Sequence, residues 1–432
     1  MRRIAAAFRA KLSSMTKRVI ALLGRKDEPT DAVEEYCHYL GGALEAHEIQ
    51  LEIRRVPWEI HGWSAALGAL ALQAQTWRDT WVLVQYTALA WSQRGFPQKF
   101  LRALEILKSA GARVAIVFHD VEPYAGTRLV DSFRRAIQVR VMRRALVIAD
   151  LAIFTVQLYR ISWLPFRPRP VVYTDRSATP PTNMSPRALE LAKEKLSPQV
   201  FGLISERQQE LSGPRDPSPL LAKCHFIPVG PNLPIPPELP SRPAKVEVPT
   251  IGIFSITGGP AGAHETEAIL TAVRQATRRF GRLRLSVFGR HAELREQDLR
   301  NDLSDLPVEL SVEGVVTAAQ VVERLCACDV LLFVRGGIST RRSSAIAAIA
   351  CGVPTVAYVG GETAYPITEA GVIVVSPSDP KELLDALVLL LSDVEFRAGM
   401  RLRNALAYAE HFAWPAIATR FAALLQPPSP SS

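Results

Sequence analysis

Apolar residues along the chain follow two spacings that alternate. Short, nearly continuous apolar runs are typical of strands buried on both faces, and apolar residues at every third or fourth position are typical of amphipathic helices. In the first half, strand-like runs lie at 18–23, 50–56, 81–86, 113–118 and 146–155, with helical patterns at 31–40, 98–110 and 129–144. This alternation predicts an α/β fold with a parallel sheet covered by helices on both sides.

The second half repeats the same rhythm. Strand-like runs lie at 250–255, 283–288, 308–312, 329–334, 355–358 and 372–375. Helical patterns lie at 265–280, 318–327, 343–351, 380–391, 395–409 and 411–425. We therefore expect two successive doubly wound, Rossmann-like domains of about 200 residues each, with ligands in a cleft at the carboxyl ends of the strands.

Proline-rich segments divide the chain. Residues 163–186 and 196–219 are too rich in proline and serine for regular elements, whereas 186–196 has a helical pattern. A second proline-dense stretch, 230–249, is typical of a linker between domains. We expect a basic tail at 1–17, an N-terminal domain at 18–235 with an insertion at about 165–222, a linker at 236–249, a second domain at 250–408, a C-terminal helix at 409–426 and a tail at 427–432.

The positive charge is concentrated at the N-terminus. Residues 1–18 contribute +6 of the net charge of +9 and contain no acid, so a nucleic-acid partner is not implied. The segment is an amphipathic helix on an anionic membrane, a disordered leader, or the result of a start codon placed too early. A second basic region is the predicted helix 129–144, which we interpret as a surface helix with a basic face, with contact to lipid phosphates as the alternative.

The composition is that of an ordinary soluble protein. Of 432 residues, 48% are hydrophobic and 22% are charged, and no apolar run reaches the roughly 18 residues that a membrane span needs. Residues 4–8 are too short for the core of a signal peptide, and the five cysteines have no zinc-binding spacing. We therefore expect a cytoplasmic protein with reduced thiols, and peripheral contact with the inner face of the membrane through the basic N-terminal segment as a further option.

Residues 335–354 (RGGISTRRSSAIAAIACGVP) combine a glycine turn, hydroxyl and guanidinium side chains, and an Ala/Ile helix. A helix N-terminus offers free N–H groups and the positive end of the helix dipole, and arginine binds phosphate in a bidentate manner. The segment therefore predicts an anion site. The alternative is that Ser339 or Thr340 only caps the helix and that the arginines are solvated.

The carboxyl half contains a series of short motifs in a fixed order. They are 350–357 (ACGVPTVA), 360–362 (GGE), 370–380 (AGVIVVSPSDP) and 411–414 (HFAW), with 226–232 (FIPVGPN) and His119-Asp120 as weaker counterparts in the amino half. Together they resemble the retaining GT-B glycosyltransferases, especially family 4, over nearly the whole chain and most strongly beyond residue 226. The resemblance implies two Rossmann-like domains that face a cleft, and a C-terminal helix that packs back toward the N-terminal domain.

The chain departs from that family at two places. The family usually carries two glutamates eight residues apart that contact the donor sugar and the ribose, and Ser339 and Ala347 stand there instead. The Arg/Lys pair that often clamps the diphosphate is also missing from 255–267. We expect the positive charge to come from three arginines of the opposite loop, Arg335, Arg341 and Arg342.

The resemblance implies a donor site on the strand-end loops of the second domain. Glycines there would let the backbone approach the phosphates, and other loop residues would meet the nucleotide base or the donor hydroxyls. The expected donor-binding residues are Gly258, Gly259, Arg290, Gly314, Val315, Arg335, Gly337, Ser339, Arg341, Arg342, Ser343 and Glu362. For the glycines and the loop residues around them, ordinary turns are the alternative.

The same resemblance implies catalytic and acceptor-side residues in the first domain. His119 would contact the donor sugar or the leaving phosphate and Asp120 would position an acceptor hydroxyl, although a histidine after a buried strand is often a core residue. The acceptor-side residues would be Asp27, Glu28, Asp31, Trp91, Arg94 and Glu122. Asp31 is equally explained as a helix cap, and Trp91 as a core residue.

The expected function is transfer of a sugar from a nucleotide-diphosphate sugar to a hydroxyl acceptor, either lipid-linked or polysaccharide, in cell-surface glycan synthesis. Retention at the anomeric carbon follows from the resemblance alone. Neither a cofactor nor a metal is expected, since the sequence has no Asp-x-Asp motif. The alternatives are a non-catalytic GT-B protein that binds nucleotide or glycan, and a nucleotide-sugar epimerase.

Overall fold

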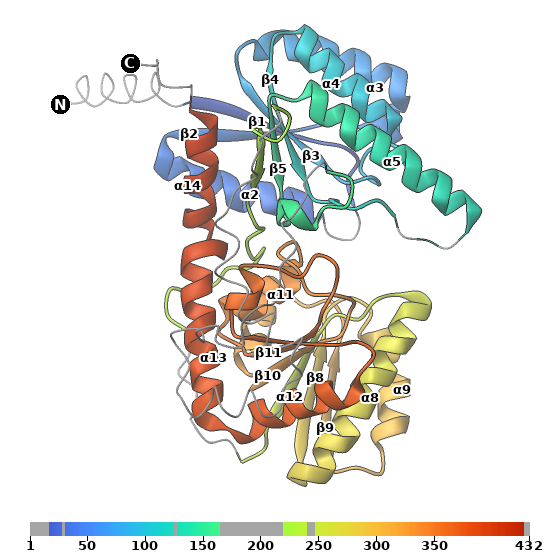
Figure 1. Ribbon diagram of the computed structural model, residues 1–432, viewed down its shortest axis with the longest axis vertical. Coiled ribbons are helices and arrows are strands. Elements are labelled where there is room, and N and C mark those ends of the chain that lie inside the picture. Colours follow the sequence, from blue (N-terminus) through green and yellow to red (C-terminus); the bar gives the residue numbers. More distant parts are fainter. Residues whose placement is uncertain are drawn as a thin grey trace, which may run out of the picture. The chain divides into compact units, whose positions relative to one another are not determined.

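A computed structural model describes residues 17–27, 31–124, 126, 128–164, 219–239 and 247–426. These residues form two compact units (Figure 1), an N-terminal unit of the described residues up to 164 with 219–228 and 414–426, and a C-terminal unit of the described residues within 229–413. The predicted basic tail up to residue 16, most of the proline-rich insertion with its helix 186–196, the core of the linker and the C-terminal tail lie outside the described residues. None of the helices described is both long and apolar enough to cross a bilayer.

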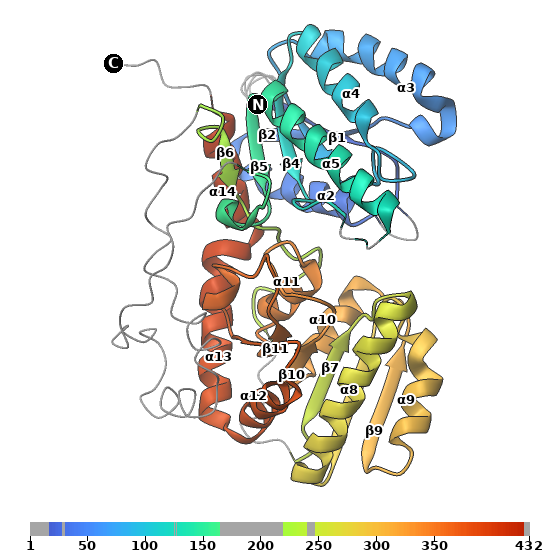
Figure 2. The ribbon, with the colours of Figure 1, turned by 45° about the vertical axis from the view of Figure 1, so that its right-hand side comes forward.

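The N-terminal unit is built on a parallel sheet of six strands in the order β2-β1-β3-β4-β5-β6. Its strands are β1 (Lys17–Leu23), β2 (Ile49–Arg55), β3 (Trp81–Tyr86), β4 (Arg113–Phe118), β5 (Leu151–Phe154) and β6 (Cys224–Phe226). Its helices are α2 (Ala32–Leu44), α3 (Trp58–Ala74), α4 (Gln98–Ser109), α5 (Leu129–Ile148) and α14 (Trp414–Leu425). Helices α3, α4 and α5 lie side by side on one face of the sheet (Figure 2), and α2 packs with α14 on the other.

The C-terminal unit repeats this architecture with the strand order β12-β11-β10-β7-β8-β9. Its strands are β7 (Thr250–Phe254), β8 (Leu283–Phe288), β9 (Val308–Glu313), β10 (Val330–Phe333), β11 (Thr355–Tyr358) and β12 (Val372–Val375). Its helices are α8 (Gly259–Phe280), α9 (Glu296–Leu303), α10 (Ala318–Cys326), α11 (Ser343–Ala350), α12 (Pro380–Ser392) and α13 (Val394–Ala407).

The strand order locates the ligand-binding edge of each sheet. In a doubly wound sheet the chain reverses direction between two neighbouring strands, and ligands bind at the carboxyl ends of that pair. The reversal falls between β1 and β3 in the N-terminal unit and between β7 and β10 in the C-terminal unit. The loops that follow these four strands are therefore the first places to look for a site.

The predicted α/β architecture with two doubly wound sheets is confirmed, and several boundaries are corrected. The strand predicted at 146–155 is wrong at its start, because residues up to Ile148 complete helix α5 and β5 begins only at Leu151. The predicted helix 411–425 is also divided: Tyr408–Phe412 form a π-helical turn, Ala413 is extended, and α14 begins at Trp414. Helices α3 and α9 were not identified from the sequence pattern.

The C-terminal helix α14 belongs to the N-terminal unit. This agrees with the expectation that a C-terminal helix packs back toward the N-terminal domain. The indole N–H of Trp81 donates to the backbone oxygen of Leu425 over 2.9 Å, and the ring of Trp414 stacks on Tyr39 of α2 at 5.7 Å. Residues 229–239, which were expected to end the N-terminal domain and begin the linker, are part of the C-terminal unit. The chain therefore passes between the units twice within the described residues.

Candidate active site

The loop after β7 forms one side of the reversal point in the C-terminal unit. Ser255 has a left-handed backbone (φ +66°), Gly258 is the N-cap of α8, and Gly259 has φ +69°. The buried carboxylate of Glu265, in the second turn of α8, accepts a hydrogen bond from the backbone N–H of Thr257 over 2.7 Å. The predicted donor glycines Gly258 and Gly259 thus stand at a helix N-terminus, with a buried acid fixing the loop.

The loop after β10 forms the other side and depends on its glycine pair. Gly336 has φ +68°, and Gly337 packs so closely on the loop after β11 that a Cβ atom would lie 2.4 Å from the Cα of Gly360. The hydroxyl of Thr363 donates to the backbone oxygen of Ile338 over 2.6 Å and accepts from the N–H of Gly360 over 2.8 Å. The loops after β10 and β11 are therefore held together as one surface.

Helix α11 begins at Ser343, with Arg342 as its N-cap and no side chain capping its first turn. The alternative that Ser339 or Thr340 only caps this helix is wrong, since both lie before the cap and both are buried. The Ser339 hydroxyl is buried without a hydrogen-bond partner among the described residues. Because a buried polar group without a partner costs about 1–3 kcal/mol, such a group calls for an explanation, and a bound ligand is one.

Three arginines gather on these loops. Arg341 forms an ion pair of 2.6 Å with Glu362, while the Nε atom of Arg342 is buried with no hydrogen-bond partner among the described residues. Burial lowers the pKa of Arg342, and the nearby charges of Arg341 and Arg335 lower it further. Burial also lowers the pKa of Arg335. Arginine stays protonated despite such shifts, so Arg335 and Arg342 both hold a positive charge in a partly buried position.

The loops after β8 and β9 adjoin this cluster. The N–H of Ile256 donates to the backbone oxygen of Arg290 over 3.0 Å, and the N–H of Gly289 donates to Gly314 over 2.9 Å. The charge of Arg290 is close enough to lower the pKa of Arg335, whose largest perturbation is burial. Val315 is 59% exposed. The structure thus brings the predicted donor-binding residues to one edge of one sheet. At this edge the arginines outnumber the two acids, Glu265 and Glu362.

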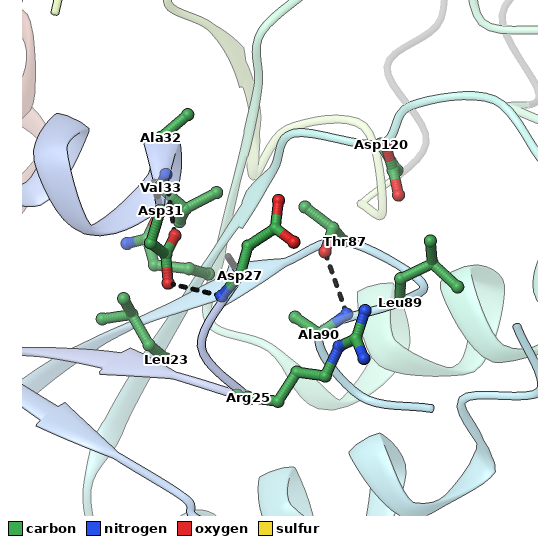
Figure 3. A pocket seen from close by; sticks show the side chains of 12 residues that line it. Leu23, Arg25, Asp27, Asp31, Ala32, Val33, Thr87, Leu89, Ala90 and Asp120 are labelled. Carbon is green, nitrogen blue, oxygen red and sulfur yellow. Dashed lines mark hydrogen bonds between the residues drawn. The ribbon is translucent and has the colours of Figure 1, made fainter. Parts of the chain in front are cut away.

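The reversal point of the N-terminal unit holds a hollow of about 230 Å³ (Figure 3). It is lined by Leu23, Gly24, Arg25 and Asp27 after β1, by Asp31, Ala32 and Val33 at the start of α2, by Gln85, Thr87, Leu89 and Ala90 around the end of β3, and by Asp120 after β4. Asp27 lies between Asp31 and Thr87 in Figure 3, and Asp120 lies beyond Thr87. Three predicted site residues, Asp27, Asp31 and Asp120, therefore line one hollow.

The structural contacts differ from one of these carboxylates to the next. Asp31 caps α2 by accepting from the N–H groups of Val33 and Glu34 at 3.1 Å, and it pairs with Arg55 at 3.1 Å. Asp120 accepts from the N–H of Ala88 over 2.8 Å through one oxygen. The capping interpretation of Asp31 is therefore sufficient, and Asp27 and Asp120 are the other two carboxylates that line the hollow.

His119 lies beside this hollow and not among its lining residues. Its Nε2 atom is 2.8 Å from the side-chain oxygen of Gln85, which does line the hollow, and its ring meets Tyr36 edge-on at 4.9 Å. The half-buried histidine is therefore held by two neighbours. A direct role for His119 in the reaction stays a prediction.

The remaining acceptor-side predictions are not gathered at the hollow. Trp91 is fully buried and donates its indole N–H to the backbone oxygen of Gln85 over 2.9 Å, so it is a core residue with no face open to a sugar. Glu122 accepts from both the N–H and the hydroxyl of Ser162, and Arg94 lies on an exposed loop. Glu28 lies outside the described residues.

Two side chains at these sites were missed by the sequence analysis. Glu265 looked like an ordinary residue of a predicted helix, and only its burial and its bond to Thr257 reveal a structural role in the donor loop. Gln85 lay inside an apolar strand-like run, where a polar residue is itself a signal because it needs a partner when buried. No group of three metal-binding side chains occurs in the part of the chain described here.

The comparisons with known proteins agree with this architecture. Residues 261–393 match the family model described as "Glycosyl transferases group 1". A comparison with curated proteins gives no significant match.

Several solved structures share the fold over nearly the full length of both chains. Anabaena Alr3699/HepE in complex with UDP and glucose is 16% identical with a TM-score of 0.53, covering 95% of this chain and 99% of its own. Sucrose-phosphate synthase from Thermosynechococcus elongatus is 15% identical with a TM-score of 0.54, over 94% and 98% of the two chains. A UDP-forming α,α-trehalose-phosphate synthase from Burkholderia xenovorans is 11% identical with a TM-score of 0.54, over 95% and 99%. The chain has the GT-B fold of these proteins, and its residues 261–393 match the family model for glycosyl transferases group 1.

Proposed function

We propose that the protein transfers a sugar from a nucleotide-diphosphate sugar to a hydroxyl group of an acceptor. The observation that carries this proposal is the cluster of Arg335, Arg341 and Arg342 at the reversal point of the unit that matches the family model. A diphosphate would add negative charge beside these partly buried guanidinium groups, of which Arg341 already pairs with Glu362. The solved complexes of HepE with UDP support a uridine nucleotide as the first donor to test.

The chemistry proposed for this site is electrostatic. As the bond between the sugar and the diphosphate breaks, negative charge grows on the leaving phosphate and positive charge on the sugar ring. Arg341 and Arg342, with the N-terminus of α11 behind them, would stabilise the leaving group without reorganising. Retention of configuration and independence from a metal are part of the proposal, and they rest on the family resemblance and on the arginines.

The acceptor is proposed to enter the hollow of the N-terminal unit. Asp27 and Asp120 can accept hydrogen bonds from the hydroxyls of a sugar or polyol, and a carboxylate in this position can take the proton of the attacking hydroxyl. Membership of family 4, a cytoplasmic location and a role in cell-surface polysaccharide synthesis are further parts of the proposal. A lipid-linked acceptor would agree with attachment of the basic N-terminal segment to the membrane.

The decisive experiment measures binding and turnover together. Calorimetry with UDP, GDP, dTDP and ADP should give saturable binding for one base, and mass spectrometry with the matching sugar donors should detect slow hydrolysis in the absence of acceptor. Arg342→Ala should weaken nucleotide binding about 10- to 100-fold, because it removes a charge-assisted contact. The control Arg300→Ala, on the outer face of α9, should leave binding unchanged. Absence of binding by all four nucleotides at millimolar concentration would reject the proposal.

A non-catalytic nucleotide-binding protein is a second candidate, favoured by one observation. Ser339 and Ala347 are buried, and the family resemblance implies carboxylates at these two positions, so two expected contacts to the donor would be missing. This candidate predicts the same nucleotide binding and the same loss in Arg342→Ala, but no release of sugar from the bound donor. Sustained hydrolysis or transfer above that of the Arg342→Ala protein would therefore exclude it.

A further inference from the structure

The outer face of helix α5 exposes large apolar side chains. Leu129 is 93% exposed, Phe133 is 62% exposed and Val130 is 48% exposed, and Tyr124 in the preceding loop is 55% exposed. Single exposed apolar residues are normal on protein surfaces, but a group of neighbours marks an interaction surface. Leu129 and Phe133 are one helical turn apart and project from the same side of the helix.

This exposure is not the result of a loosely held helix end. Arg134 donates to the backbone oxygen of Arg94 over 2.9 Å, and its guanidinium covers the ring of Tyr124 at 5.0 Å. Gln138 accepts from the N–H of Tyr124 and donates to the backbone oxygen of Gly95, both over 2.8 Å. The first half of α5 is thus anchored to two loops, and its apolar residues are presented to solvent by an ordered support.

The same side of α5 is basic further along the helix. Arg140 and Arg144 are exposed, and among the described residues no ion pair links either of them to an acid. The acid nearest in sequence, Asp131, is buried and is already paired with Arg134. A helix of 20 residues is about 30 Å long, so the surface is apolar over its first half and cationic over its second.

We propose that this surface, formed by Leu129, Val130, Phe133, Arg140 and Arg144 and called the α5 face below, docks on an anionic lipid bilayer. Aliphatic and aromatic residues enter the boundary between headgroups and acyl chains, while arginines bind the phosphates. The apolar residues lie in the N-terminal half of α5, so the N-terminal end of the helix enters the bilayer more deeply than the C-terminal end. The proposal is independent of the basic segment 1–18 and of the sugar that is transferred.

The combination of apolar and cationic side chains on one helix favours a bilayer over a protein. A rigid protein partner would need an apolar patch and carboxylates at fixed positions opposite this helix. A fluid bilayer supplies both an apolar layer and mobile phosphates. An acidic protein partner is therefore an outcome of the test and not the proposal.

The test is vesicle flotation of the full chain with phosphatidylcholine alone and with mixed phosphatidylcholine and phosphatidylglycerol. The wild type should bind the mixed vesicles preferentially and less tightly at high salt. Leu129→Asp/Phe133→Asp should weaken binding at least tenfold, because the apolar contact is replaced by charge that the lipids repel. Arg140→Gln/Arg144→Gln should weaken it about fivefold for each arginine and remove the preference for phosphatidylglycerol.

Matched controls separate this surface from charge and hydrophobicity in general. Leu402→Asp/Leu406→Asp changes two exposed leucines of α13, and Arg278→Gln/Arg279→Gln removes two exposed arginines at the end of α8. Both control proteins should bind vesicles as the wild type does. The glutamine variant alters only exposed side chains, so it keeps the test valid if the aspartate variant misfolds. Binding of the α5 variants equal to that of the wild type, or no vesicle binding by the wild type, would overturn the proposal.

Discussion

The two units place opposite charges on the same architecture. Each has a parallel sheet of six strands, and each has its loops of interest at the carboxyl ends of the strands where the chain reverses. At that point the N-terminal unit carries Asp27, Asp31 and Asp120 around a hollow, and the C-terminal unit carries three arginines beside a helix N-terminus. The sheets determine where a ligand can bind, and the loops determine what kind of ligand it is.

The difference also shows how each site is built. In the N-terminal unit the carboxylates have local partners. Asp31 caps helix α2 and pairs with Arg55, and Asp120 accepts a hydrogen bond from a backbone N–H. In the C-terminal unit the Nε atom of Arg342 is left buried and without a partner among the described residues. We infer that the arginine site depends more on its ligand, and the following predictions test that asymmetry.

Reversing the charge of the arginine site should have the largest effect. Arg341→Glu/Arg342→Glu places two carboxylates beside Glu362 and should reduce nucleotide binding at least 1,000-fold, since each lost contact to a phosphate is worth about 10- to 100-fold and the new charges repel. Calorimetry measures the effect. Arg278→Glu/Arg279→Glu, in the last turn of α8, makes the same change in charge away from the site and should be near neutral.

Separating the two loops of the arginine site should have the next largest effect. Gly337→Ala would place a methyl group 2.4 Å from the Cα of Gly360, so the loops after β10 and β11 must move apart. We expect nucleotide binding to fall about 10- to 100-fold, since displacement of charge-assisted contacts by an ångström removes most of their strength. Gly361→Ala is the matched control, because a Cβ atom there meets nothing within 4 Å. Equal binding by the two variants would contradict the close-packed arrangement.

Changing the acidic hollow should act on the acceptor and not on the donor. Asp120→Asn keeps an oxygen that can accept from the N–H of Ala88, so the loop should stay folded. We expect the KM for the acceptor to rise about tenfold while the affinity for the nucleotide stays unchanged, because a neutral amide binds a donating hydroxyl less strongly. Glu105→Gln, on the outer surface of α4, serves as the control. A loss of nucleotide affinity in Asp120→Asn would mean that the two sites are not chemically separate.

The sequence predicted elements better than it predicted contacts. Strands β3, β4, β8, β11 and β12 begin and end at the expected residues, because each is a short apolar run bounded by polar or turn residues. The end of α5 and the start of β5 were confused, since a continuous apolar run suits both a buried strand and a buried helix end. The glycine pair before α11 was recognised, because only a tight backbone approach requires two adjacent glycines there.

The sequence predicted those parts of the sites that follow from which strand-end loops are neighbours. Strand-end residues such as Asp27 and Asp120 meet because parallel strands bring their carboxyl ends together. The burial of Trp91 and the pairing of Arg341 with Glu362 depend on how loops fold over the sheet, which spacing along the chain does not contain. The role of Glu265 was hidden for the same reason, since its partner is a backbone N–H eight residues earlier.

The two units should also differ, more weakly, in their response to acid. All seven tryptophans, at positions 58, 63, 77, 81, 91, 163 and 414, lie in the N-terminal unit. Tryptophan fluorescence therefore reports the unfolding of this unit alone, whereas circular dichroism reports both units.

His225 in β6 is half-buried, and burial lowers its pKa below the ordinary value of 6.5. The folded unit therefore binds fewer protons than the unfolded chain, and this histidine makes stability fall as the pH drops from about 6.5 through the lowered folded pKa. His225→Gln cannot be protonated, so it should reduce the loss of Tm between pH 7 and pH 5 by a few degrees in fluorescence. The same loss in both proteins would show that other groups control the acid response of this unit.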